Sequence, residues 1–136
     1  MQLSDTLKIA AAGMKAQGDR LRVVSENIAN ADSTGPTPGS EPYRRKVVMF
    51  QNVLDRELGM ETVKVVKRTH DQSDFKKQFD PAHPAADDQG YVLYPNVNTI
   101  VEMMDMREAR RGYEANLNMI EISKAMLTRT IDLLRG

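Results

Sequence analysis

The sequence of 136 residues contains no cysteine and no tryptophan, and only 5% of its residues are aromatic. The absence of cysteine excludes a disulfide framework, a thiol nucleophile and thiolate metal ligands. With 40% hydrophobic residues and so few large rings, the chain has little material for an extensive core of its own. No apolar run reaches the roughly eighteen residues that a membrane-spanning helix needs, so no membrane insertion is expected.

An excess of charge is also absent. Nineteen basic and nineteen acidic residues balance, and they balance separately within residues 1–39, 40–95 and 96–136. No segment therefore presents a basic surface for nucleic acid or an acidic tail, whereas zero net charge favours self-association. The first residues lack a basic leader followed by an unbroken apolar core, so a cleaved signal peptide is not expected.

The chain does contain helical periodicity at both ends. In residues 1–31 and 96–136, apolar residues recur at alternating steps of three and four, as in a heptad repeat. At about 1.5 Å per residue the second helix would be roughly 55 Å long, more than the rest of a small chain can cover, so we expect other chains to complete its burial. The predicted packing seam comprises Leu7, Met14, Leu21, Ile28, Leu117, Ile120, Leu127, Ile131 and Leu134.

The middle of the chain has the texture of strands. Residues 32–42 are rich in proline and glycine and predict an extended loop. Residues 43–95 predict a small antiparallel β-module, with strands near 43–54, 61–68, 75–79 and 91–94. The expected fold class is α+β, in which the terminal helices form an antiparallel coiled coil and the β-module is inserted between them. In that arrangement Leu21, Val24 and Ile28 would meet residues such as Ile100, Met103 and Met106.

One stretch gathers residues of the kind that bind metals or catalyse reactions. It contains His70, Asp71, Asp74, His83, Asp87 and Asp88. The two histidines are not spaced four apart on a helix, prolines interrupt the segment, and no HExxH pattern occurs. We expect a solvated loop, and therefore no catalytic residue, metal site, cofactor or small-molecule substrate.

A basic stripe on the second helix leaves two interpretations open. Arg107, Arg110, Arg111 and Glu114 share one face by their spacing, which is typical either of a solvated surface or of a contact with acidic groups on a neighbouring subunit. The methionines at 103, 104, 106, 119 and 126 are likewise open to two readings, as ordinary core filler or as an interface that adapts to unlike neighbours.

Two long motifs resemble those of a known family. The segment SENIANADSTG followed by YRRKVVMFQ is similar to the Asn-x-Ala-Asn motif, Thr/Gly turn and Tyr-Lys/Arg strand of the axial proteins of the bacterial flagellum. The segment from Asp87 to Leu134 is similar to the pattern of their proximal-rod members. The matching residues are Asn27, Ala29, Asn30, Ala31, Thr34, Gly35, Tyr43, Arg44, Gly90, Tyr91, Val92, Pro95, Asn96, Val97, Arg111, Tyr113, Ala115 and Asn116.

The resemblance implies a non-enzymatic subunit of the basal-body rod. Its partners would be other rod proteins, copies of itself and the flagellar type III export apparatus. It would lie in the periplasmic part of the basal body after export without cleavage, and would assemble helically to transmit torque. The alternative is a soluble coiled-coil adaptor or export-related binding protein that does not polymerise, although such a protein would not need the β-module or the Asn-x-Ala-Asn motif.

Overall fold

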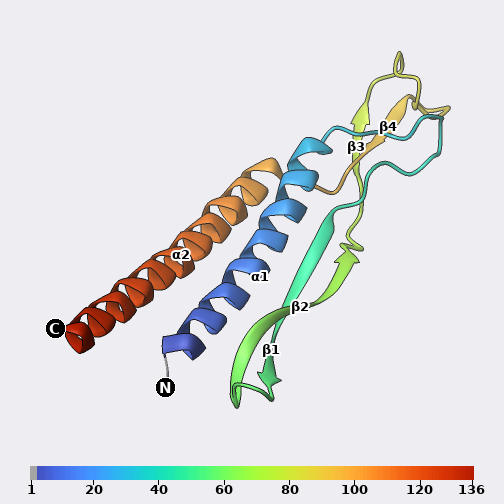
Figure 1. Cartoon of the computed structure of the whole chain (residues 1–136). Coiled ribbons are helices and arrows are strands. Elements are labelled where there is room, and N and C mark those ends of the chain that lie inside the picture. The colour runs from blue at the N-terminus through green and yellow to red at the C-terminus, as the bar shows by residue number, and fades with distance from the viewer. Residues whose placement is uncertain (1–2) are drawn as a thin grey trace. The chain divides into compact units, whose positions relative to one another are not determined.

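The structure is a computed structural model that describes residues 3–136. Along the chain, a long helix α1 (Leu3–Ala29) is followed by four strands and then by a second long helix, α2 (Thr99–Arg135) (Figure 1). These are β1 (Lys46–Asp55), β2 (Met60–His70), β3 (Lys76–Phe79) and β4 (Tyr91–Tyr94). The predicted α+β class is confirmed. Within residues 3–136, neither helix combines the length and the apolar character that crossing a membrane requires.

The chain divides into two compact units. The first unit comprises residues 1–21, 49–67 and 107–136, and the second unit comprises residues 22–48 and 68–106. Each helix, and the hairpin of β1 and β2, therefore contributes one segment to each unit. The second unit also contains the whole of β3 and β4.

Within the first unit, α1 and α2 meet through small residues. Ala10, Ala16, Ala109 and Ser123 are buried. A Cβ atom added to Gly13 would lie 2.7 Å from Nδ2 of Asn116, and one added to Gly112 would lie 3.0 Å from the Gln17 side chain. As residue numbers rise along α1, the contacted numbers fall along α2, so the segments run antiparallel, as predicted. The small side chains allow the two backbones to approach closely.

The strands form two separate two-stranded sheets, β1 with β2 and β3 with β4. The turn of the first hairpin is closed by the Gly59 N–H, which donates to the Asp55 carbonyl at 2.8 Å, and Gly59 has a positive φ of 64°. In the second sheet the strands are antiparallel, with Lys76 opposite Tyr94 and Phe79 opposite Tyr91. The rings of Phe79 and Tyr91 meet edge to face, with centroids 5.4 Å apart.

The start of α2 differs from the expectation in one respect. Asn98 caps the helix, since its side-chain oxygen accepts hydrogen bonds from the N–H groups of Ile100 and Val101. Ile100 and Met103, however, are exposed and do not face α1, so the predicted apolar contact with them is wrong. The buried residue in this turn is Glu102, whose carboxylate accepts from Asn27 on α1 at 3.2 Å. In this turn of α2 the buried contact with α1 is therefore polar and not apolar.

Candidate functional site

Asn27 lies in the last turns of α1, and both the oxygen and the nitrogen of its side-chain amide form hydrogen bonds. Its Oδ1 accepts from the Lys46 N–H at 2.9 Å and from the Tyr43 hydroxyl at 2.7 Å. Its Nδ2 donates to the Lys46 carbonyl at 2.9 Å and to the Glu102 carboxylate. The side-chain amide thus pairs with a peptide group as a neighbouring strand would, which explains how a residue only 1% exposed remains satisfied. Asn27 ties the end of α1 to the start of β1.

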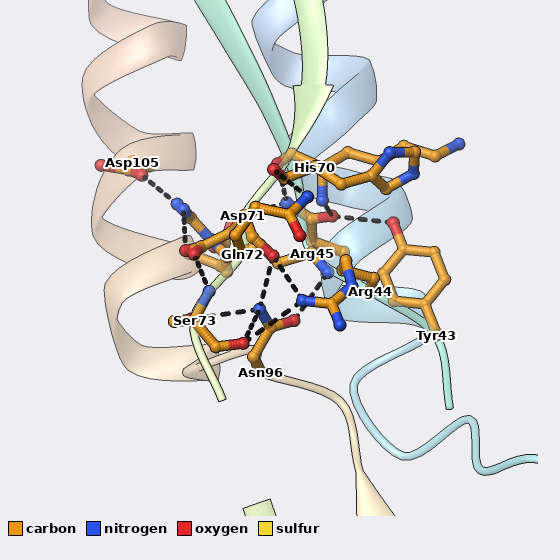
Figure 2. A network of polar contacts seen from close by, with 12 residues as sticks. Tyr43, Arg44, Arg45, His70, Asp71, Gln72, Ser73, Asn96 and Asp105 are labelled. Carbon is orange, nitrogen blue, oxygen red and sulfur yellow. Dashed lines mark hydrogen bonds and ion pairs between the residues drawn. The ribbon is translucent and has the colours of Figure 1, made fainter. Parts of the chain in front are cut away.

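Glu102 is completely buried and pairs with Arg45. The Arg45 Nε–H donates to Glu102 Oε1, and the same guanidinium lies 3.4 Å from Asp71 and 3.7 Å from Asp105. Figure 2 shows the contacts of Arg45 with Asp71 and Asp105 as dashed lines. A buried, unpaired carboxylate costs several kcal/mol, of order 3–5 when its partner is removed. The pairing with Arg45 is therefore a condition for burying Glu102.

Asn96 joins the segment before α2 to the ends of β1 and β2. Its Oδ1 accepts from the Arg45 N–H at 2.8 Å, and its Nδ2 donates to the carbonyls of Asp71 and Ser73. Arg44 donates to the same two carbonyls and covers the Phe75 ring, with 4.2 Å between the guanidinium carbon and the ring centroid. The contacts of Asn96, Arg44, Asp71 and Ser73 are drawn in Figure 2.

We call this network the polar hub and keep the name for ten residues of the second unit: Asn27, Tyr43, Arg44, Arg45, Lys46, Asp71, Ser73, Asn96, Glu102 and Asp105. They come from α1, β1, the segments flanking the strands, and α2. The hub therefore fixes four stretches that are far apart in sequence. Within the hub, hydrogen-bond donors of one residue pair with acceptors of another, which suits a junction that holds the fold together.

The hub shifts the protonation of its own members. The main-chain N–H and hydroxyl of Ser73 lower the pKa of Asp71, and the Arg45 guanidinium lowers it further. Burial lowers the pKa of Arg45, but the hydrogen bonds and charges of Glu102 and Asp71 outweigh it, and the net pKa is raised. Burial raises the pKa of Tyr43, which keeps its hydroxyl protonated as the donor to Asn27. The ion pair of Arg45 with Asp71 is therefore formed at neutral pH.

The structure brings part of the predicted assembly motif together. Asn27, Tyr43, Arg44 and Asn96 lie in the hub. Asn30 ends α1, with its Nδ2 donating to the Glu26 carbonyl at 2.8 Å. The other motif residues lie outside the hub: Gly35, Gly90, Pro95 and Val97 are buried, Asn116 faces Gly13, Thr34 and Tyr113 are half-buried, and Ala29, Tyr91, Arg111 and Ala115 are exposed. Their role in assembly stays a prediction.

The predicted packing seam falls into two groups. Half-buried members are Leu7, Met14, Leu21, Ile28 and Ile120, and exposed members are Leu117, Leu127, Ile131 and Leu134. The buried residues of α2, Glu102, Ala109 and Ser123, are seven and fourteen positions apart, and the half-buried Asn116 lies midway between the last two. Met119, Ile122, Met126 and Leu133 of α2 are exposed as well, and by helical spacing the exposed apolar residues cover more than one side of the helix. We call these eight exposed residues the open face of α2.

Residues 70–88, which contain the potential metal-binding or catalytic side chains, form structural contacts. Asp71 belongs to the hub, and Nδ1 of His83 accepts from the Ala85 N–H at 3.0 Å. Asp87 accepts from the N–H groups of Gln89 and Tyr91 and so shapes the loop before β4. In the described part of the chain, residues 3–136, no group of three or more potential ligands converges on a metal-sized site.

Several hub residues were not expected from the sequence. The sequence does not indicate a structural role for Arg45, Lys46, Ser73, Glu102 or Asp105, because charged and polar residues on a helix or strand are usually solvated. A signal was available in the positions 102, 109, 116 and 123, which are Glu, Ala, Asn and Ser at a strict seven-residue spacing. This spacing places the four residues on one side of α2, but the rule that the apolar stripe faces inward does not select that side.

Comparisons with known proteins agree with the motifs. A family model for the flagella basal body rod protein matches residues 7–37, and one for the flagellar basal body rod FlgEFG protein C-terminal region matches residues 88–133. The chain is 54% identical over 134 residues to the flagellar basal-body rod protein FlgC of Agrobacterium fabrum, covering 98% of this chain and 96% of that protein. It is 40% identical to FlgC of Salmonella typhimurium, with 98% of each chain covered, and 38% identical to FlgC of Borreliella burgdorferi over the whole of both.

The fold and the two matched ends define a flagellar axial protein with paired terminal helices. At this identity and coverage, the chain belongs to the flagellar basal-body rod protein family and is FlgC-like. The hub lies between and partly within the two matched regions, since Asn27 falls in the first and Glu102 in the second.

Proposed function

We propose that the protein is a structural, non-enzymatic subunit of the proximal rod of the flagellar basal body. It assembles with other rod proteins and with copies of itself into a helical tube that transmits torque. The observation that carries this proposal is the open face of α2: Leu117, Met119, Ile122, Met126, Leu127, Ile131, Leu133 and Leu134 are all exposed. A free chain gains by covering such a face, because removing apolar surface from water is favourable by about 25 cal/mol per Å².

Helical assembly follows from the type of contact. A face of one subunit that packs on a different face of the next makes a head-to-tail contact, and such a contact that does not close on itself generates a helical filament. The methionines of the open face suit contacts with unlike neighbours, because their unbranched side chains fill irregular gaps. The basic stripe at Arg107 and Arg111 is exposed beside this face and is available to acidic groups of a neighbour.

We also propose that the protein reaches the periplasmic section of the basal body through the flagellar type III export apparatus, without removal of a leader. The support for this proposal is the chain's membership of the flagellar basal-body rod protein family. The domain division proposed for assembly is a coiled-coil domain of residues 1–31 and 96–136, a loop of residues 32–42 and a β-module of residues 43–95.

The test is to purify basal bodies from cells that carry an epitope-tagged copy as their only copy, and to follow the chain by mass spectrometry. Recovery with the rod at constant stoichiometry, with the initial residues of the chain retained, is the expected result. Recovery only from the soluble fraction, in cells whose rods are complete, would favour the non-polymerising adaptor. Loss of the first residues from the assembled chain would contradict export without cleavage while leaving the rod assignment intact.

A further inference from the structure

The first turns of α2 are oriented against the usual preference for apolar burial. Between Thr99 and Met106, the fully buried side chain is Glu102, whereas Ile100, Val101, Met103 and Met104 are all exposed. Helices of small proteins normally turn their apolar stripe inward and their charged residues outward. In the second unit this arrangement is reversed over two turns of helix, so another interaction must determine which face of α2 points inward.

A rotation of α2 by one residue position about its axis would give an alternative orientation. Successive residues of an α-helix are separated by about 100° around its axis, so a rotation by one position would replace Glu102 at the inner face by Val101 or Met103. That rotation would bury apolar surface and return a carboxylate to water, and both changes are favourable by themselves. Apolar packing alone therefore favours an orientation different from the one observed.

The contacts of Glu102 account for the observed orientation. One carboxylate oxygen accepts from Arg45 and the other accepts from Asn27, so the two partners come from different elements. Each partner is itself held by main-chain contacts. The Arg45 carbonyl accepts from the Asp71 N–H at 2.8 Å and the Arg45 N–H donates to Asn96, while the Asn27 amide is paired with both main-chain groups of Lys46. Rotation of α2 would leave a guanidinium and an amide donor without their buried acceptor.

We propose that Glu102 is a positioning residue: its two-sided contact with Arg45 and Asn27 sets the rotation of α2 about its axis and keeps Ile100, Val101, Met103 and Met104 outward. A buried polar group of this kind selects one packing arrangement among several, as a buried asparagine does in a coiled coil. The proposal concerns the free chain and does not depend on the rod assignment. Its consequence is that the apolar surface at the start of α2 is present before any partner binds.

Replacing the pair by apolar residues separates orientation from stability. In the full-length double variant Arg45→Ala/Glu102→Ala, no buried charge is left unpaired, so the chain should keep its helical circular dichroism and a cooperative urea transition. Because alanine offers less apolar surface at position 102 than Val101 or Met103, apolar packing then favours turning one of these two side chains inward. The readout is the rate at which hydrogen peroxide converts each methionine to its sulfoxide, followed by peptide mass spectrometry. Met103 and Met104 are 58% and 66% exposed, and Met119 and Met126, at 47% and 53%, are internal references in the first unit.

We expect oxidation of Met103 or Met104 to slow at least threefold relative to Met119 and Met126 in this variant. The matched control is Arg110→Ala/Glu114→Ala, which makes the same chemical change at an exposed ion pair of the same helix, with 3.7 Å between the charged atoms, and should keep the wild-type ratio. An unchanged ratio in a folded Arg45→Ala/Glu102→Ala chain would overturn the proposal. Loss of the cooperative transition would overturn it too, because the pair would then be needed for stability rather than for orientation.

Discussion

In the second unit α1 and α2 meet through a buried carboxylate and its two partners, whereas in the first unit they meet through glycine and alanine. The contact of Asn27 with Glu102 is specific, because only one arrangement satisfies both groups. The contact of Gly13 with Asn116 requires close approach and buries little apolar surface. The second unit therefore carries the specificity of the helix pair. Both units leave large apolar residues of α2 exposed, where a neighbouring chain can cover them.

The sharpest way to break this comparison is to place a charge on the open face. Leu127 is 42% exposed, so Leu127→Asp should change the free energy of unfolding of the free chain by less than about 0.5 kcal/mol. In the rod the new carboxylate would be buried without a partner, at a cost of several kcal/mol, and incorporation should fall below detection. Motility in soft agar and the amount of the chain in purified basal bodies measure the effect.

The matched control is Ala125→Asp, which introduces the same charge at another exposed position of α2. It should assemble better than Leu127→Asp, because the two side chains point about 160° apart around the helix. Wild-type motility of Leu127→Asp would show that the open face is not an interface.

The next largest effect should come from removing one partner of an ion pair in each unit. Arg45→Ala leaves the buried Glu102 carboxylate unpaired and should lower the free energy of unfolding by about 3–5 kcal/mol. Arg20→Ala in the first unit removes a 3.5 Å pair with the largely exposed Glu108 and should cost at most about 1 kcal/mol. Urea denaturation of both variants gives the difference directly. Similar losses of unfolding free energy in the two variants would mean that the ion pair of Arg45 with Glu102 matters no more to stability than a surface ion pair.

Much of the fold could be predicted because its signals are local. The periodicity of three and four gave both helices to within a few residues, and alternation and turn residues gave the four strands. The orientation of α2 was predicted incorrectly at Ile100 and Met103, since a count of apolar residues does not distinguish a face buried in the chain from one that is left for another chain. Periodicity also does not report that Glu102 would find Arg45 and Asn27, which lie 57 and 75 residues away in the sequence.

Smaller changes in stability are expected from glycine-to-alanine substitutions that test how closely α1 and α2 approach each other in the first unit. Gly18→Ala adds a Cβ that meets no atom within 4 Å, so the variant should gain up to about 1 kcal/mol from helix propensity. Gly13→Ala should lose this gain, since its Cβ would lie 2.7 Å from Asn116 Nδ2, which is already bonded to the Gly112 carbonyl at 2.9 Å. Thermal unfolding compares the two variants.

The combination Gly13→Ala/Asn116→Ala, measured against Asn116→Ala alone, should recover the gain, because the obstructing side chain is gone. A gain from Gly13→Ala equal to that from Gly18→Ala, in the wild-type background, would show that the two helices are not in close contact at this point.

The smallest effect is a pH dependence that belongs to the second unit. The pKa of Asp71 is lowered in the folded chain by Ser73 and Arg45, so the folded state favours the ionised carboxylate more than the unfolded state does. Its contribution to stability is therefore complete above the unfolded pKa of about 3.9 and is lost as the pH falls through the lower folded value. Asp71→Asn removes this titration. The variant should be less stable than the wild type at pH 6, and the difference between their urea midpoints should narrow as the pH is lowered through 4 towards 3. A difference that stays constant over this range would mean that Asp71 stabilises the hub through its shape and main-chain contacts and not through its charge.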